Sequence, residues 1–147
     1  MKNKFVRDKE TRLSLSSLIA LSRADQKVGK LSYETIRPSG LTTSQFAVLE
    51  VLYSKGDLKI CQIIDSILTT SGNITVIIKN LEKEGFIKKL KDPEDSRAVL
   101  ISLTDKGKEV IEDILPKHFE NIKNIFSVLD EEEKEQLIKI LSKIRKL

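Results

Sequence analysis

The hydrophobic period of this sequence changes abruptly within residues 69–107, and this change constrains the fold more than any other feature. Before Gly85 the apolar residues are spaced by three and four, as on a helix that packs on a core through one face: Ile74, Ile77, Ile78 and Leu81. After Gly85 the pattern becomes β-like, with alternation clearest at Val99, Ile101 and Leu103. Residues 91–97 separate the β-type runs with a polar, proline-containing stretch that fits only a hairpin tip. The segment therefore predicts a helix followed directly by a two-stranded hairpin.

The helix of this segment is expected to start at Ser71, after a cap at Thr69 or Thr70, and to stop at Gly85. Its outward face begins with small and polar residues, and no acidic residue precedes Glu82. Such a helix can enter the major groove of DNA, where the N–H groups at its start can meet a phosphate. The residues expected to approach the groove or its phosphates are Ser71, Asn73, Thr75, Val76, Lys79 and Asn80.

The predicted hairpin has a positive edge formed by four basic residues: Lys88, Lys89, Lys91 and Arg97. Asp95 is placed either to hydrogen-bond locally or to pair with Arg97, and Leu58-Lys59 is expected to add a short strand beside the hairpin. A helix followed at once by a basic two-stranded flap is the winged helix-turn-helix arrangement. In it the helix reads a major groove and the flap reaches the DNA backbone or the minor groove. We expect the three lysines to contact the backbone.

The run from Asp92 to Gly107, DPEDSRAVLISLTDKG, resembles the wing and the following helix start of the MarR family of bacterial transcription regulators. That family is marked by Asp-x-Arg, a short strand and then Leu-Thr-x-x-Gly. The upstream runs SGNIT and NLEKEGFI are similar to its recognition helix, and the resemblance extends from about Leu41 to the C-terminus. It implies that Arg97 enters the minor groove and that Asp95 is the partner that fixes it.

The expected fold is mainly α with a small β-hairpin wing, an α+β winged helix-turn-helix in a single MarR-like domain over residues 1–147. Residues of about 41–103 would form the DNA-binding lobe. The flanking regions, about 9–35 and 104–147, carry long apolar stripes that exceed what one lobe can cover. They are therefore expected to form a dimerisation region, and the chain a homodimer. The resemblance implies the same arrangement, with the first and last helices interdigitating.

Several helix ends can also be predicted. Thr42 and Gln45 form a capping box before a second helix whose apolar side is Phe46, Val48, Leu49, Val51 and Leu52. A third helix is expected from Ile60 to about Leu68. Thr104 should cap a long helix that Pro116 kinks rather than ends, and Asp130 with Glu133 should cap the last helix.

The sequence offers little support for an enzyme or a metal protein. With one histidine and one cysteine among 147 residues, a zinc site of the Cys-rich kind cannot be built within one chain. No catalytic or nucleotide-binding motif is present, and no cofactor is expected. His118 is expected to be a packing or surface residue. No apolar run is long enough to suggest a membrane span or a signal peptide, so a cytoplasmic protein is expected.

These features predict a homodimeric transcriptional regulator, a repressor that binds double-stranded DNA at a pseudo-palindromic operator. The resemblance implies an effector, a small aromatic or phenolic compound or an oxidant, bound between the lobe and the dimer helices; the sequence names no residue for it. Two alternatives stay open. One is a winged-helix module that binds another protein. The other is a redox sensor using the Cys61 thiol, although we expect Cys61 to be an inert residue packed in its helix.

Overall fold

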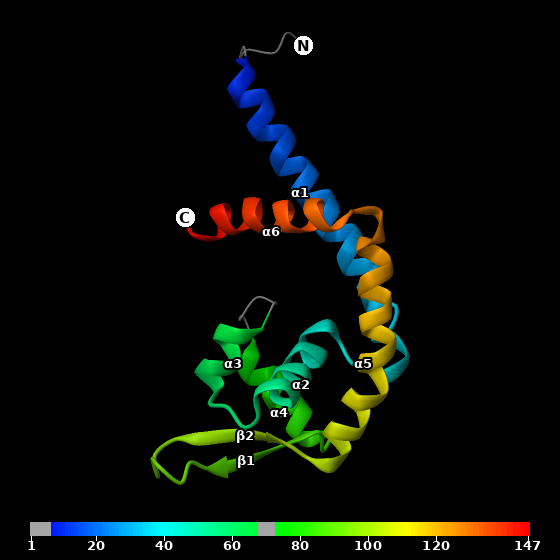
Figure 1. The fold of residues 1–147 in the computed structure, drawn as a ribbon. Helices are drawn as coiled ribbons and strands as arrows, with labels where there is room; N and C mark the ends of the chain where they lie inside the picture. The colour runs from blue at the N-terminus through cyan, green and yellow to red at the C-terminus, as the bar shows by residue number, and fades with distance from the viewer. Residues whose placement is uncertain (1–6, 68–72) are drawn as a thin grey trace, which may run out of the picture.

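The structure is a computed structural model that describes residues 7–67 and 73–147 (Figure 1). Along the chain its α-helices, strands and short 3-10 helices are α1 (Lys9–Tyr33), η1 (Arg37–Ser39), α2 (Thr43–Lys55), α3 (Ile60–Ser66), α4 (Ile74–Lys83), β1 (Ile87–Lys91), β2 (Val99–Leu103), α5 (Asp105–Ile125), η2 (Phe126–Val128) and α6 (Glu131–Arg145). The predicted order of a helix, a hairpin and then a long helix is confirmed. Among the described residues none of the helices combines the length and the apolar character that crossing a membrane requires.

A lobe built from α2, α3, α4 and the β1–β2 hairpin occupies one end of the molecule (Figure 1). Its core is continuous from η1 to α5, and at its centre Leu49, Ile63, Leu81 and Ile101 are fully buried. The buried residues of α2 are Phe46, Val48, Leu49, Val51 and Leu52, as its sequence spacing predicts. Burial of these faces against one another holds α4 and the hairpin in a fixed relation.

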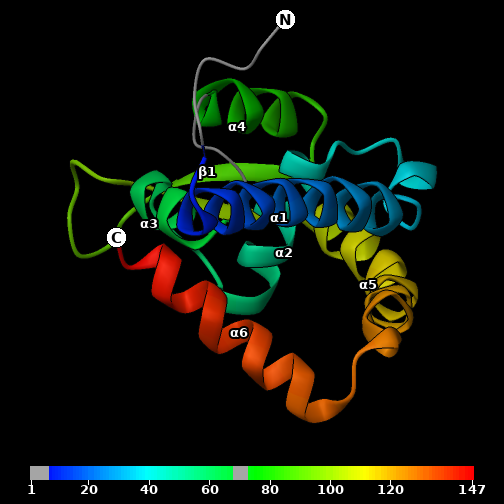
Figure 2. The same ribbon diagram turned by 90° about the horizontal axis from the view of Figure 1, so that it is seen from above.

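Outside the lobe, α1 rises away from it and α6 projects from the far end of α5 (Figure 1); seen from above, α1 extends over the lobe (Figure 2). Neither α1 nor α6 has a buried residue within the chain. Their apolar side chains stand exposed instead, among them Leu13, Leu18, Ile138 and Ile144. These two helices therefore leave apolar surface that a single copy of the chain does not cover.

The hairpin is antiparallel, with Ile87 opposite Leu103 and Lys91 opposite Val99. The short strand predicted at Leu58-Lys59 is reduced to a single bridge, which joins Leu58 to Ile101 beside the wing. Ile87 and Ile101 are buried, so one face of the hairpin is anchored in the core near its base while the tip extends beyond it (Figure 1). Anchoring the base fixes the direction in which the tip points.

The caps predicted at Thr42, Thr104 and Asp130 form. The Thr42 hydroxyl accepts from the Gln45 N–H, and the Gln45 side chain accepts from the Thr42 N–H, which completes the capping box. Thr104 caps α5 by accepting from the Gly107 N–H, and Asp130 with Glu133 caps α6. α5 runs without a break through Pro116. The predicted end of α3 is wrong, because Ile67 has extended backbone angles and α3 ends at Ser66 rather than at about Leu68.

Candidate nucleic-acid interface and effector pocket

The outer face of α4 is uncovered. Ile74, Ile78 and Leu81 are buried in the lobe, whereas Thr75, Val76, Lys79 and Asn80 are exposed, with Val76 at 52%. The side of α4 that the sequence predicts to be exposed therefore faces solvent. Ser71, also proposed as a groove residue, lies outside the described residues, as do Thr69 and Thr70.

The start of α4 differs from the prediction. The helix begins at Ile74, and Asn73 is the residue before it, in the left-handed region with φ of 88°. Asparagine tolerates this conformation better than most residues with a β-carbon. Asn73 is exposed and its side chain forms no cap hydrogen bond, so it stands at the helix entrance rather than on the helix flank.

The lysines of the wing do not share one face. In the ladder Lys89 lies opposite Ile101 and Lys88 opposite Ser102, and neighbouring residues of a strand point to opposite sides. Lys89 and Lys91 therefore project from one face and Lys88 from the other. Lys89 also lies 3.9 Å from the Glu82 carboxylate of α4, a partly exposed pair. The single positive edge predicted from the sequence is thus divided between two faces.

At the tip of the wing, Asp95 shapes the turn. Its carboxylate accepts from the Arg97 backbone N–H over 3.0 Å, and its carbonyl accepts from the Ala98 N–H over 3.0 Å. Of the two alternatives left open for Asp95, local hydrogen bonding is the one observed. Within residues 7–67 and 73–147 no ion pair joins the Arg97 guanidinium to an acid, so Asp95 fixes the backbone of Arg97 and leaves its side chain exposed.

A contact made by the turn of the wing was not predicted. Lys59, which precedes α3, lies 3.7 Å from the Asp92 carboxylate, and only 11% of the Asp92 side chain is exposed. The same carboxylate accepts from the Glu94 N–H over 2.9 Å. Asp92 therefore connects the turn of the wing to the start of the helix-turn-helix pair.

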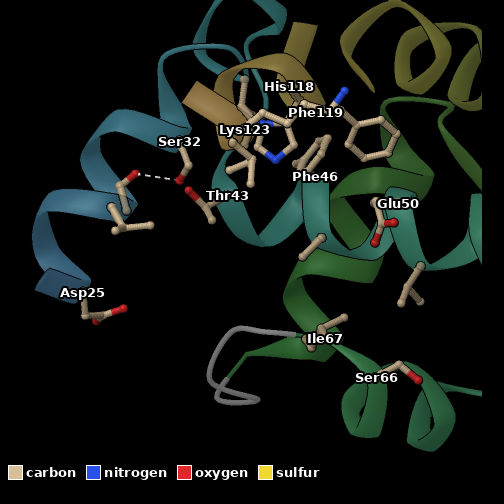
Figure 3. A pocket seen from close by; sticks show the side chains of 16 residues that line it. Asp25, Ser32, Thr43, Phe46, Glu50, Ser66, Ile67, His118, Phe119 and Lys123 are labelled. Atoms are coloured by element: carbon tan, nitrogen blue, oxygen red, sulfur yellow. Dashed lines mark hydrogen bonds between the residues drawn. The ribbon is translucent and has the colours of Figure 1, made fainter. Parts of the chain in front are cut away.

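A pocket of about 730 Å³ lies between α1, α2 and α5 (Figure 3). Its walls are mainly apolar and include Val28, Ile36, Phe46, Val51 and Ile122. Polar groups enter it from each element: Asp25 and Ser32 from α1, Glu50 from α2, His118 and Lys123 from α5. An apolar pocket with a few polar groups is the common form of a small-molecule site.

His118, expected to be a packing or surface residue, lines this pocket and is only partly exposed. Its Nδ1 lies 2.9 Å from the Thr35 hydroxyl oxygen, and its ring meets the Phe46 ring edge-on with centroids 4.8 Å apart. Burial lowers the pKa of the His118 imidazole from its ordinary value of 6.5, and the nearby charge of Glu50 opposes that shift. The imidazole is therefore neutral near pH 7.

Cys61 lies exposed in the first turn of α3, which corrects the expectation that its helix packs around it. The prediction that its thiol is inert stays a prediction. In the part of the chain that the structure describes, His, Cys, Asp and Glu side chains form no group of three or more that could hold a metal.

Comparison with known proteins agrees with this geometry. The family model of the SarA/Rot transcriptional regulators matches residues 30–114. The HTH-type transcriptional regulator YkoM of Bacillus subtilis is 38% identical over 136 residues, covering 92% of this chain and 88% of YkoM. The regulator MhqR of the same organism is 38% identical over 134 residues, covering 91% of this chain and 92% of MhqR.

Among solved structures, Bordetella bronchiseptica BpsR, whose DNA binding is regulated by 6-hydroxynicotinic acid, superimposes with a TM-score of 0.77. It is 26% identical, and the match covers 87% of this chain and 91% of BpsR. The fold and these likenesses define a DNA-binding transcriptional regulator of the winged helix-turn-helix class. The chain belongs to the MarR family, which confirms the family predicted from its wing; this family is not enzymatic.

Proposed function

We propose that this protein is a homodimeric repressor that binds a pseudo-palindromic operator in double-stranded DNA and is released by a small aromatic effector. The observation that carries the DNA-binding part is the pairing of an uncovered α4 face with an exposed basic wing. Residues 41–103 form the reading lobe in this proposal, and residues 9–35 and 104–147 form the dimerisation region.

In the complex, α4 enters the major groove with Thr75, Val76, Lys79 and Asn80 toward the bases and phosphates. Asn73 lies at its entrance, where the first N–H groups of a helix favour a phosphate, and Ser71, outside the described residues, is proposed as a further groove residue. Lys88, Lys89 and Lys91 contact the backbone, and Arg97 enters the minor groove. The exposed guanidinium of Arg97, held on a backbone that Asp95 fixes, supports that assignment.

The apolar surfaces of α1 and α6 support dimer formation. Leu13 and Leu18 are each 59% exposed, Ile138 is 67% exposed and Ile144 is 50% exposed in the single chain. A second copy that covers these residues would remove a large apolar area from water. Two lobes related by a twofold axis would read half-sites about 10–10.5 base pairs apart.

The pocket between α1, α2 and α5 supports control by an effector. It touches both the lobe, through α2, and the helices assigned to dimerisation, through α1 and α5. The regulation of BpsR by 6-hydroxynicotinic acid supports an aromatic molecule as the effector class. An effector releases DNA only if it binds more tightly to the conformation in which the spacing of the two lobes does not fit DNA.

Salt-dependent binding tests the DNA-binding part. The purified protein is titrated by fluorescence anisotropy into a labelled duplex from the region upstream of its own gene, at several salt concentrations. We expect log K to fall with log salt by about 0.9 per neutralised phosphate. Lys79→Ala should weaken binding, whereas Lys139→Ala on the exposed surface of α6 should not. Absence of salt-sensitive duplex binding would favour the protein-binding module instead.

A further inference from the structure

The wing is attached to the lobe at two places along its length. At its base Ile87 and Ile101 are buried in the core. Beyond the end of β1 the Asp92 carboxylate lies 3.7 Å from the Lys59 ammonium. In both views α3, which follows Lys59, lies on the side of the lobe toward which the wing tip projects (Figures 1 and 2). A hairpin held only at its base can tilt, and a small tilt displaces the tip most. The second attachment therefore restricts where the tip can lie.

Lys59 is held firmly from the side of the lobe. Its N–H donates to the Gln62 side chain over 2.9 Å, and its carbonyl oxygen accepts from the Ile63 N–H over 3.1 Å at the start of α3. The preceding residue, Leu58, exchanges two backbone hydrogen bonds with Ile101 of β2, of 3.1 and 2.8 Å. The ammonium of Lys59 therefore extends from a backbone that is fixed to both α3 and β2.

Asp92 is connected through the turn of the wing to Arg97. Its N–H donates to the Ala98 carbonyl oxygen over 3.2 Å, and its carboxylate accepts from the Glu94 N–H over 2.9 Å. Asp95 accepts from the N–H groups of Arg97 and Ala98. These hydrogen bonds close the turn into one unit. A displacement of Asp92 is therefore passed to the backbone that carries the Arg97 guanidinium.

Burial makes this pair different from an ordinary surface ion pair. Only 11% of the Asp92 side chain is exposed, against 41% of the Lys59 side chain. A carboxylate that is largely removed from water needs a counter-charge, and loss of the partner leaves that charge uncompensated. Without the Lys59 ammonium, the turn would have to move to return the carboxylate to water. The position of the tip in which the two charges meet is therefore the favoured one.

We propose that Lys59 and Asp92 are positioning residues for DNA recognition: their ion pair sets the place of the wing tip relative to α4, so that Arg97 reaches the minor groove while α4 lies in the major groove. This inference rests on the proposed DNA-binding function and adds to it the contact that matches the two elements to one duplex. A carboxylate near phosphates repels them, so removal of its charge alone would strengthen binding. Loss of the positioning contact would weaken binding instead.

The sign of this effect tests the proposal. Asp92→Asn keeps an oxygen that can accept from the Glu94 N–H and loses the charge that faces Lys59. Glu94→Gln removes the same charge from an exposed side chain of the same turn, for which residues 7–67 and 73–147 supply no ion pair. Both are titrated by fluorescence anisotropy against the labelled duplex from upstream of the gene. Glu94→Gln should bind at least as tightly as the wild type, and Asp92→Asn about three- to tenfold more weakly than Glu94→Gln.

A double-mutant cycle with Arg97→Ala separates positioning from a general loss of stability. If the ion pair acts by placing Arg97, Asp92→Asn should change affinity by less than about twofold once the guanidinium is absent. A general structural effect would weaken binding by the same factor in both backgrounds.

Lys59 provides a second pair of variants, which carries the test if Asp92→Asn does not fold. Lys59→Arg keeps a cation beside Asp92 and should bind as the wild type does. Lys59→Gln removes the cation and should weaken binding by a larger factor when Arg97 is present than in Arg97→Ala. Thermal unfolding of each variant shows that it is folded at the temperature of the titration.

The outcomes separate the positioning role from DNA binding itself. If the wild type binds the duplex and Asp92→Asn binds as tightly as Glu94→Gln, the role of the pair is overturned and DNA binding stands. Equal losses with and without Arg97 would overturn that role in the same way. If the wild type shows no salt-sensitive binding to the duplex, the DNA-binding proposal is overturned, and the role of the pair with it.

Discussion

The Thr104 hydroxyl donates a 2.6 Å hydrogen bond to the Gly85 carbonyl oxygen, and so joins the end of the reading helix to the start of α5. The Thr104 hydroxyl oxygen also accepts from the Gly107 N–H as the cap of α5, and the Lys106 ammonium donates to the Glu84 carbonyl oxygen. α5 also lines the effector pocket through His118 and Ile122. Movement of α5 relative to the lobe would thus act directly on the turn that follows α4.

Replacing Thr104 with valine should destabilise the protein by about 1–3 kcal/mol, because both a helix cap and a part-buried hydrogen bond are lost. Urea unfolding followed by circular dichroism measures the change. The matched control is Thr75→Val, at an exposed threonine of α4, which should stay within about 0.5 kcal/mol of the wild type. Equal midpoints for the two variants would show that the Thr104 junction contributes nothing to stability.

Gly107 packs against the Phe86 backbone so closely that an added β-carbon would collide with the Phe86 carbonyl oxygen. A backbone atom cannot move aside cheaply, so Gly107→Ala should cost about 1–3 kcal/mol. Gly29→Ala is the opposite case, because that glycine lies inside α1 with open space around it. It should stabilise the helix by about 0.5–1 kcal/mol. Thermal unfolding of the pair checks both signs, and a Gly107→Ala protein as stable as the wild type would contradict the packing.

Arg97→Ala should weaken operator binding by about tenfold or more, since Arg97 is assigned to the minor groove, and should lower the salt slope by about one. Anisotropy titrations measure both quantities. Arg145→Ala, at an exposed arginine near the end of α6, serves as the charge-matched control and should bind as the wild type does. A folded Arg97→Ala dimer with unchanged affinity would refute the wing assignment.

The stability of the protein should depend on pH through His118. Because its folded pKa is lowered below 6.5, the unfolded chain takes up the proton first as the pH falls. The stabilisation is therefore complete above about pH 6.5 and is lost as the pH falls toward the folded pKa. Between about pH 8 and pH 5.5 the wild type should lose more stability than His118→Phe. Parallel curves for the two proteins would exclude this contribution. Asp25, Glu50 and Lys123 also face the pocket and are common to both proteins.

Ile144→Glu should shift the dimer toward monomer without unfolding the chain. Ile144 is 50% exposed in the single copy, so its replacement costs little within the fold but places a charge in the proposed dimer interface. Sedimentation velocity at several concentrations measures the equilibrium, with Lys143→Glu at the neighbouring exposed position as the control. An unchanged dimer would place the interface elsewhere.

Local patterns in the sequence predicted local structure well. The five buried residues of α2 and the caps at Thr42, Thr104 and Asp130 follow from helical spacing and from the chemistry of short polar side chains. The start of α4 was predicted less well, because the left-handed Asn73 has no strong signature in a run of small polar residues. The division of the wing lysines required the strand register, which the charge pattern alone does not contain.

The pocket could not be predicted from the sequence, for a different reason. His118 and Thr35 are 83 residues apart, and only the packing of α5 beside the end of α1 brings them together. The contact between Lys59 and Asp92 likewise depends on tertiary structure. The available signal for His118 was its place as the single histidine near the middle of a long helix, which does not distinguish a pocket residue from a surface residue.

A DNase I footprint upstream of the protein's own gene tests most directly whether two paired lobes read a duplex. We expect protection of two inverted half-sites about 10–10.5 base pairs apart, centre to centre, and their joint loss in Ile144→Glu. Protection of a single half-site by a monomer, or no protection anywhere in that region at low ionic strength, would contradict the account.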